Sequence, residues 1–362
     1  MNAGPTKILV VDDSALYRQS IQNVLREVAD ASIVGLAKDG VEALGKIEQL
    51  DPDLLTLDVQ MPDMDGIELL QEIKRRRLRP KAIMVSSHTS EGAKVTTAAL
   101  MEGAFDFILK PSSPDSTANR QQLRDALEEK ISAFRDSSLE RKRTARRSAI
   151  RQDVGADDVV EVAPAPKAAC QAVVLGCSTG GPEALKAVLP KLPAELPAPV
   201  LVVQHMPAQY TRSLAARLNE ICELDVVEGV DNMVAVSGKI IIAPGGKQMR
   251  LASDETNLLV HVNDDPTENG LRPSVDYLMR SVADVLSGRA LAVIMTGMGR
   301  DGLVGCRHLK QAGGYVFAQC QDDCIVYGMP KVVIEEALAD RVLPLGKIAP
   351  AMVRHVKRSR RS

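Results

Sequence analysis

The sequence predicts an α/β protein with two doubly wound domains, one built on five parallel strands and the other on a mainly parallel sheet with one β-hairpin. Short apolar runs alternate with amphipathic stretches in both halves of the chain, which is typical of parallel strands covered by helices on both faces. The alternation stops between residues 111 and 168 and then resumes. The 362 residues are enough for two domains of ordinary size, each with its own core.

The first half contains the five predicted strands and the helices that connect them. The β-rich runs are Lys7–Val11, Ser32–Ala37, Leu54–Val59, Ala82–Ser86 and Phe105–Leu109. The amphipathic stretches are Asp13–Ala29, Val41–Leu50, Gly66–Arg76 and Gly92–Met101. Ligands of such sheets bind beyond the carboxyl ends of the strands, so the residues that follow these strands are the first candidates for a functional site.

The middle of the chain is predicted to be a linker. A helical pattern over Leu123–Phe134 gives way to a run of Arg and Lys between residues 141 and 151 and then to an Ala-Pro-Ala-Pro stretch ending at Pro166. Low hydrophobicity, charge and proline favour a linker that is only partly helical at its start. The basic run is either an anionic docking patch or, the alternative we favour, a solvated face. We place the domains at 5–130 and 169–350, the linker at 131–168 and a disordered basic tail at 351–362.

The second half repeats the alternation and adds a hairpin. The predicted strands are Ala172–Leu175, Val200–Val203, Lys239–Ala243, Ala290–Met295 and Tyr315–Ala318. The predicted helices are Glu183–Leu189, Arg212–Asn219, Val275–Leu286, Gly302–Ala312 and Pro330–Leu338. Two further β-rich runs, Met249–Ala252 and Leu258–Val262, are separated by a short polar segment, which predicts an antiparallel pair.

Composition argues against several functional classes. Trp is absent, aromatic residues make up 2% and the formal net charge is -2, so nucleic-acid binding is not expected. The six cysteines fit no zinc pairing and are expected to be reduced thiols of a cytosolic protein. The N-terminus is unlike a signal peptide, and no apolar run approaches the ~18 residues that span a bilayer. We therefore expect a cytoplasmic monomer that does not insert into membranes.

Acidic residues follow two strands of the first half. Asp12 and Asp13 come after the first strand and Asp58 ends the third, so a parallel sheet would gather them at one edge. Clustered carboxylates repel one another, and a hard cation such as Mg²⁺ relieves that repulsion. Lys110, after the fifth strand, and Ser86, at the end of the fourth, could contact a phosphoryl group on Asp58. The alternative is that these Asp residues only cap helices.

The same positions closely resemble a response-regulator receiver domain over about residues 5–130. The matching stretches are Leu9-Val-Val-Asp-Asp13, Asp58-Val-Gln-Met-Pro62, Met64-Asp-Gly66, Met84-Val-Ser86 and Lys110-Pro111. The resemblance implies a flavodoxin-like fold with Asp58 as phospho-acceptor. It implies Mg²⁺ bound by Asp13, Asp58 and the backbone carbonyl of Gln60, with Asp12 in the outer coordination shell. The family's switch positions are occupied by Ser86, Phe107 and Lys110. An aromatic residue at 107 is equally what a buried strand would carry.

Ser178 lies between a predicted strand and a predicted helix, in the sequence Gly176-Cys-Ser-Thr-Gly-Gly181. The glycines permit a sharp turn, and the N–H groups at the start of the helix suit a developing oxyanion. This pattern predicts a serine nucleophile, although a Ser that caps the helix would look similar.

A base and an orienting acid are available at neighbouring strand ends. His205 comes directly after the strand Val200–Val203, and Asp301 follows Ala290–Met295. Asp301 could also be the N-cap of the next helix. The chain order Ser, His, Asp differs from the Ser, Asp/Glu, His order of α/β-hydrolases, so the turn motif does not imply that family.

Residues 170–350 resemble instead the catalytic domain of the chemotaxis protein-glutamate methylesterase. The matching stretches are Gly176-Cys-Ser-Thr-Gly-Gly-Pro182, Gln204-His-Met-Pro207, Ile242-Ala-Pro-Gly245, Arg272-Pro-Ser-Val-Asp276 and Met295-Thr-Gly-Met-Gly-Arg-Asp-Gly302. The resemblance implies Ser178 as nucleophile, His205 as base and Asp301 as orienting acid. Met298 matches a position of the oxyanion region, and Thr179 adjoins the nucleophile.

Together the two resemblances imply a phosphorylation-activated esterase. It would demethylate glutamates and deamidate glutamines of chemoreceptors, with a chemotaxis histidine kinase as phosphodonor and no cofactor for hydrolysis. The unphosphorylated receiver would cover the catalytic crevice. The alternatives are a signalling adaptor whose second domain only binds a partner, and a peptidase or lipase, for which the sequence offers no cleft or acyl-chain feature.

Overall fold

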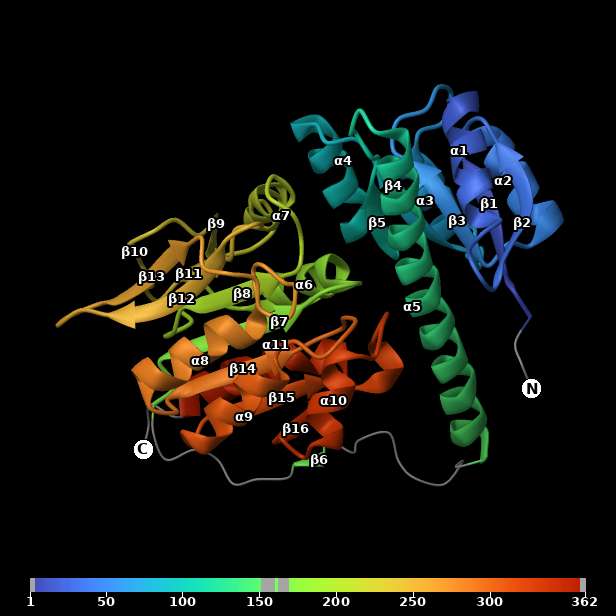
Figure 1. Ribbon diagram of the computed structural model, residues 1–362. Coiled ribbons are helices and arrows are strands. Elements are labelled where there is room, and N and C mark those ends of the chain that lie inside the picture. The colour runs from blue at the N-terminus through green and yellow to red at the C-terminus, as the bar shows by residue number, and fades with distance from the viewer. Residues whose placement is uncertain (1–3, 151–159, 162–168, 359–362) are drawn as a thin grey trace. The chain divides into compact units, whose positions relative to one another are not determined.

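The computed structural model describes residues 4–150, 160–161 and 169–358, and the chain divides into two compact units, residues 1–147 and 148–362 (Figure 1). Each unit has its own parallel sheet. The predicted fold class, two doubly wound α/β domains, is confirmed.

The first unit is a five-stranded parallel sheet in the order β2-β1-β3-β4-β5, which is the flavodoxin-like order. Its strands are β1 Thr6–Val11, β2 Ala31–Ala37, β3 Leu54–Asp58, β4 Lys81–Ser86 and β5 Asp106–Leu109. The connecting helices are α1 Ala15–Leu25, α2 Gly40–Leu50, α3 Gly66–Arg75 and α4 Ser90–Met101. Polar residues start them as local chemistry predicts: Asp65 and Glu68 form a reciprocal capping box on α3.

Helix α5, Ser116–Ile150, is much longer than the predicted stretch that ended at Phe134. Its first half packs on the sheet through buried Leu123, Leu127 and Ile131, and the ring of Phe134 meets that of Phe105 edge-on at 5.5 Å. The helix continues into the expected linker because residues 116–150 contain no Gly or Pro and are rich in good helix formers. The Ala-Pro-Ala-Pro stretch lies outside the described residues.

The second unit has an eight-stranded sheet in the order β6-β16-β15-β14-β7-β8-β11-β9, parallel except for β6. The five predicted strands are β7 Ala172–Cys177, β8 Val200–Gln204, β11 Lys239–Ile242, β14 Ala290–Ile294 and β15 Tyr315–Gln319. Three short strands that the pattern missed extend its edges: β6 Val160–Glu161, β9 Asp225–Glu228 and β16 Arg341–Leu343. The predicted hairpin is β12 Gln248–Ser253 with β13 Leu258–Asn263, joined by β10 Met233–Val234 in a separate antiparallel sheet.

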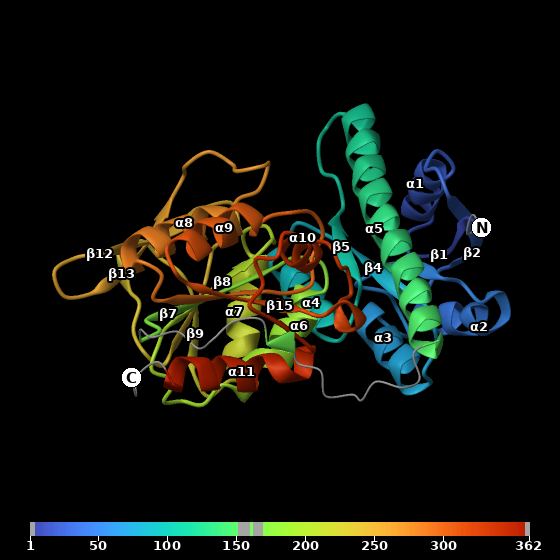
Figure 2. The same ribbon diagram turned by 90° about the horizontal axis from the view of Figure 1, so that it is seen from below.

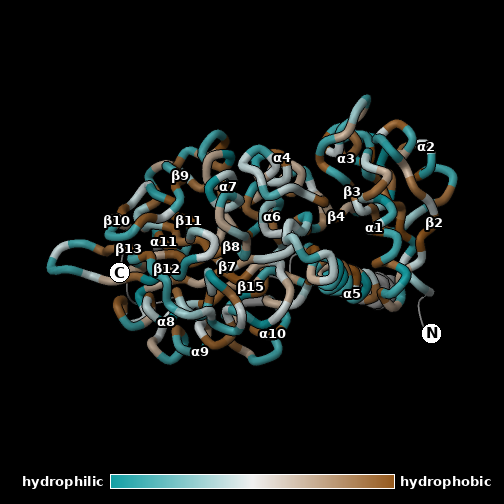
Figure 3. Tube along the Cα trace, turned by 45° about the horizontal axis from the view of Figure 1, so that its top comes forward, coloured by the Kyte–Doolittle hydropathy of each residue, from teal (hydrophilic) through white to brown (hydrophobic). Residues whose placement is uncertain are grey.

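Helices cover both faces of the second sheet. They are α6 Gly181–Val188, α7 Tyr210–Asn219, α8 Val275–Leu286, α9 Leu303–Gln311, α10 Met329–Glu335 and α11 Leu345–Arg358, with 3₁₀ turns η1 Leu189–Lys191 and η2 Gln321–Asp323. Figure 2 shows α8 and α9 on one face and α11 on the other. The core is aliphatic, as the scarcity of aromatic residues requires. Figure 3 shows the contrast between the hydrophobic inner strands and the mainly hydrophilic α5.

The expected disordered tail at 351–362 was wrong for residues 351–358, which belong to α11. One side of this helix is apolar, and Ile348, Met352 and Val356 are fully buried. These apolar residues recur every four positions, so they lie on one side of the helix. Burial of that side favours an ordered helix in spite of the basic residues between them. Among the described residues, no helix combines the length and the apolarity needed to cross a bilayer.

Candidate active site and phosphorylation site

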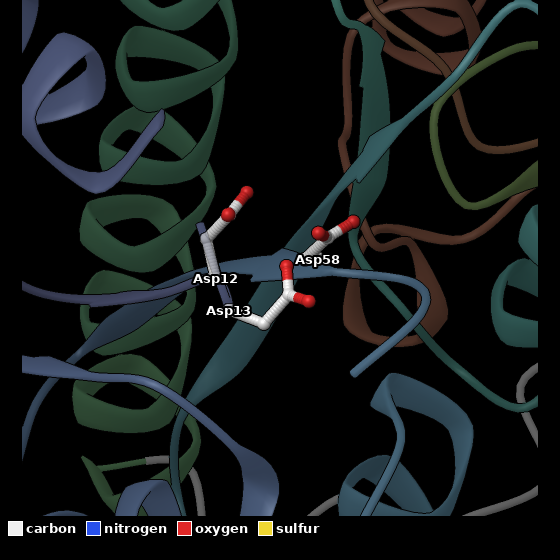
Figure 4. A group of neighbouring side chains, drawn as sticks. All are labelled: Asp12, Asp13 and Asp58. Atoms are coloured by element: carbon white, nitrogen blue, oxygen red, sulfur yellow. The ribbon is translucent and has the colours of Figure 1, made fainter. Parts of the chain in front are cut away.

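The carboxylates of Asp12, Asp13 and Asp58 form one cluster at the carboxyl ends of β1 and β3, with oxygens within 4.8 Å of one another (Figure 4). Asp12 is fully buried and Asp58 is 6% exposed, while Asp13 is open to solvent. Adjacent parallel strands end at the same edge, so residues far apart in the sequence meet there. Gln60 lies in the loop directly after β3, two residues beyond Asp58.

Lys110 brings a positive charge to this cluster. Its Nζ lies 2.8 Å from Oδ2 of Asp58 and 3.0 Å from Oδ2 of Asp12. Burial raises the pKa of Asp58 to about 6, and the charge of Asp12 adds to this while the Lys110 hydrogen bond opposes it. The guanidinium of Arg18 also lies here and donates to the carbonyls of Asp12 and Asp13. Three carboxylates against these two cations still leave an excess of negative charge on oxygen ligands, which fits a hard divalent cation such as Mg²⁺.

The predicted switch residues lie on the next two strands. Ser86 is buried at the end of β4, where its Oγ accepts a hydrogen bond of 2.7 Å from Oγ1 of Thr96 in α4. Phe107 is half-buried in β5, in register with Met84 of β4. Tyr17 was not predicted as part of this site, but the centroid of its ring lies 4.4 Å from Nζ of Lys110. Its place four residues after Asp13 was the one signal for it in the sequence.

Ser178 directly follows β7, at the turn into α6. The interpretation of Ser178 as a helix cap is wrong, because the N-cap of α6 is Gly180, in the left-handed region at φ 77°. The N–H of Ser178 donates to the carbonyl of Thr296 over 3.0 Å. A side chain at Gly297 would lie 2.8 Å from Cβ of Ser178, so this turn is closely packed against the loop after β14.

The imidazole of His205 is joined to the carboxylate of Asp301. His205 directly follows β8, and its N–H donates to the carbonyl of Cys177, the residue before Ser178. Nε2 of His205 lies 2.7 Å from Oδ2 of Asp301. Because the Asp301 carboxylate is bonded to Nε2, Nδ1 is the ring nitrogen that can accept a proton from a nucleophile. The His205 side chain is 11% exposed and that of Asp301 1%, so the imidazole reaches solvent while the carboxylate does not.

The first turn of α8 holds Asp301 in place. Oδ2 accepts from the backbone N–H of Val275 at 2.7 Å, and Oδ1 accepts from Ser274 Oγ and Asp276 N–H, both at 2.9 Å. Burial raises the pKa of Asp301, but the hydrogen bond and charge of His205 and these N–H groups outweigh it, and the pKa falls below its usual range. The N-cap interpretation of Asp301 is wrong in detail, since Gly302 is the N-cap of α9.

Thr179 and Met298 lie close to this site in the chain and differ in burial. Thr179 is 4% exposed, and its carbonyl accepts from Oγ1 of Thr296 at 3.0 Å. Met298 is half-buried in the loop between β14 and α9 that also carries Asp301. The thiol of Cys177, next to Ser178 in the chain, is buried, which raises its pKa and keeps it protonated.

Several polar residues that were not predicted from the sequence support the site. Each is at least 98% buried and hydrogen-bonded to one of the predicted site residues or to the turns that carry them: Gln204, Ser274, Asp276 and Thr296. Burial raises the pKa of Asp276 to about 6, and the nearby charge of Asp301 adds to that rise. All four lie within the sequence stretches that carried the family resemblance, which was the available signal.

Comparisons with known proteins agree with both halves of the chain. The family model described as CheB methylesterase matches residues 173–352, and the response regulator receiver domain model matches residues 8–129. A protein-glutamate methylesterase/protein-glutamine glutaminase of Desulfotalea psychrophila is 42% identical, covering 97% of this chain and 98% of its own length. The protein of the same name from Bacillus subtilis is 40% identical, with 98% and 99% covered.

A solved structure also resembles the second unit. The crystal structure of the Thermotoga maritima CheB methylesterase catalytic domain is 41% identical in sequence and has a TM-score of 0.50. It covers 51% of this chain and 97% of its own. With full-length relatives at this identity, the chain belongs to the protein-glutamate methylesterase/protein-glutamine glutaminase family, whose catalytic domain here follows a response-regulator receiver domain.

Proposed function

We propose that the protein is a phosphorylation-regulated hydrolase that removes methyl esters from glutamate side chains of chemoreceptors and deamidates receptor glutamines. The observation that carries the proposal is the 2.7 Å contact between Nε2 of His205 and Oδ2 of Asp301. The backbone N–H of His205 donates to the carbonyl of Cys177, which ties this pair to the turn that carries Ser178. An adaptor domain has no need of a buried carboxylate that orients a partly exposed imidazole. The family names of the relatives supply the substrate class.

The proposed reaction is acyl transfer in two steps. Oγ of Ser178 attacks the ester carbonyl while Nδ1 of His205 takes its proton, and Asp301 stabilises the imidazolium through Nε2. The negative charge on the carbonyl oxygen faces backbone N–H groups of the turn before α6. His205 then gives the proton to the departing methoxide oxygen, which leaves as methanol, or to the departing amide nitrogen of a glutamine, which leaves as ammonia, and the acyl group stays on Ser178. Water activated by His205 then releases the glutamate. No cofactor is needed for these steps.

The receiver half is proposed to control this reaction. Asp58 would accept the phosphoryl group from a chemotaxis histidine kinase, and Lys110 would pair with the phosphoryl oxygens. Asp13, Asp58 and the Gln60 carbonyl would hold Mg²⁺, which neutralises phosphoryl charge when bound, with Asp12 beside them. We further propose that the protein is a cytoplasmic monomer.

The test of the proposed chemistry is Ser178→Ala. We expect it to abolish methanol release from a methyl-esterified receptor, because the substitution removes only the nucleophilic hydroxyl at a tight turn. An unchanged thermal midpoint of unfolding is the control for folding of the second unit, and labelling of Asp58 by acetyl phosphate is the control for the first unit. Full activity of the purified variant would exclude Ser178 as the nucleophile.

A further inference from the structure

The side chain of Gln204 joins the backbones of the two residues proposed as nucleophile and base. It is the last residue of β8 and is 2% exposed. Its Nε2 donates to the carbonyl of Ser178 at 3.0 Å and to that of His205 at 3.3 Å. Its Oε1 accepts from the thiol of Cys177 at 3.1 Å. Both amide donors are therefore committed to catalytic residues rather than to the general core.

The second glycine of the turn makes room for this amide. Gly180 adopts φ 77°, which explains its own identity. Gly181 has an ordinary helical role, but a Cβ there would lie 1.8 Å from Oε1 of Gln204. Any side chain at 181 would displace the Gln204 amide from the backbone of the turn. The two glycines are thus required for different reasons: Gly180 for its left-handed backbone conformation, and Gly181 for the space that the Gln204 amide occupies.

Fixing the carbonyl of Ser178 also fixes the N–H of Thr179. The two groups belong to one planar trans peptide unit and point in opposite directions. The Ser178 carbonyl is held by Gln204 and by the N–H of Gly181, at 2.8 Å. The next carbonyl, of Thr179, is held by Oγ1 of Thr296. In strand-to-helix nucleophile turns, the N–H of the residue after the nucleophile stabilises the oxyanion.

We propose that Gln204 is a positioning residue for the oxyanion site. It holds the Ser178–Thr179 peptide so that the Thr179 N–H faces the charge that develops in the transition state, and it ties this peptide to the backbone of His205. The inference rests on the proposed hydrolase function. Gln204 itself does not touch the substrate, so its loss affects the rate of the chemical step more than substrate binding.

The test is Gln204→Met in the full chain, phosphorylated with acetyl phosphate. The probe is a helical peptide carrying one glutamate γ-methyl ester. Loss of one oxyanion donor costs about 10²–10³ in kcat, and because Gln204 only orients a donor we expect a fall in kcat of about 10–100-fold, with KM within about 3-fold. A boronic acid analogue of the side chain, which forms a tetrahedral adduct with serine, should lose affinity by the same factor as kcat/KM.

The matched control is Asp340→Asn, which weakens a buried structural interaction at the opposite edge of the sheet. Asp340 is 4% exposed and accepts from Lys310 and from the N–H of Val316, at the start of β15. It should lower the thermal midpoint and leave kcat unchanged. Should Gln204→Met not accumulate as folded protein, Gln204→Leu provides the same test, since its apolar side chain of similar size cannot donate to either carbonyl.

Unchanged kcat in a folded Gln204 variant overturns the inference, and so does an equal loss of kcat in Asp340→Asn at the same thermal midpoint. A rise in KM alone also overturns it. The wild type and Ser178→Ala are run in parallel. A wild type that releases no methanol would remove the proposed function and this inference with it, whereas an active wild type with an unaffected Gln204→Met removes only the inference.

Discussion

At the scale of single residues, Asp301 shows how a helix start prepares a carboxylate for an imidazole. Its carboxylate accepts hydrogen bonds from two N–H groups of the first turn of α8 and from the hydroxyl of Ser274, in addition to its contact with His205. Partial positive charge at a helix N-terminus favours the ionised carboxylate. The lowered pKa of Asp301 agrees with this, because these donors and His205 outweigh its burial.

We expect Asp301→Asn to lower kcat for ester hydrolysis strongly without unfolding the domain. The amide keeps the shape of the side chain but directs an NH₂ group either at His205 or at a backbone N–H, which favours the wrong imidazole tautomer. The same change in a serine protease cost about 10⁴ in kcat, and we expect a smaller loss here. Methanol release measures it. A variant with wild-type kcat would reduce Asp301 to a structural role.

The phosphorylation site makes a second prediction at this scale. Asp58→Asn should prevent labelling by acetyl phosphate. Labelling of the wild type should require Mg²⁺ or Mn²⁺, because the clustered carboxylates repel an anionic phosphodonor unless a cation is bound. Phosphate-affinity gels measure the label. Asp53→Asn is the matched control, since Asp53 precedes the same strand at its other end and should label normally. Label retained on Asp58→Asn would place the acceptor elsewhere.

At the scale of elements, α11 covers one face of the second sheet and packs a half-buried histidine against it. The ring of His355 lies 4.9 Å from that of Tyr315 and 5.6 Å from that of Phe317, both on β15. Burial lowers the pKa of His355 to about 4, with Arg341 adding to this and Asp340 opposing it. The imidazole is therefore neutral in the folded protein at pH 5, where the unfolded chain binds a proton.

This arrangement predicts acid-sensitive docking of α11. A depressed pKa gives stability that is fully present above about pH 6.5 and is lost as the pH falls toward 4. Between pH 7 and pH 5 the loss is on the order of 2 kcal/mol. His355→Phe keeps an aromatic ring but cannot titrate, so its free energy of unfolding in urea should fall less over this range. Identical pH dependence in variant and wild type would show that His355 does not contribute.

At the scale of the whole molecule, two sites on one chain form a switch only if phosphorylation changes the stability of one arrangement over another. Ser86 offers a local basis for such a change. Its hydroxyl is bonded to Thr96 of α4, and a phosphoryl group on Asp58 would compete for it. The proposed consequence is a rearranged α4 surface and a catalytic crevice that the receiver no longer covers.

Removing residues 1–168 should give a catalytic domain that is more active than the unphosphorylated full chain. The catalytic domain of the Thermotoga maritima relative was solved alone, which supports independent folding. A typical coupling of about 1–3 kcal/mol corresponds to roughly 5–150-fold in rate. Methanol release from the two forms measures it, and phosphorylation should move the full chain toward the truncated one. A truncated domain no faster than the resting enzyme would rule out simple occlusion.

Sequence patterns correctly predicted the α/β class, all five strands of the first sheet and the five central strands of the second. They also predicted the strand ends that carry Asp58, Ser178 and His205. It could do so because buried parallel strands are continuous apolar runs, and the edge where they end is where ligand-binding residues gather. Local patterns therefore identified residues 96 positions apart, His205 and Asp301, as members of one site.

Only the tertiary structure decided what holds that site together. The strand β9 at one edge of the second sheet and the strand β16 next to the other edge are short and partly exposed, so no apolar run marks them. The roles of Gln204, Ser274 and Thr296 depend on hydrogen bonds to residues 26, 27 and 117 positions away. A buried polar side chain is indistinguishable in sequence from an exposed one, because its partner is set by how strands and helices pack and not by its neighbours in the chain.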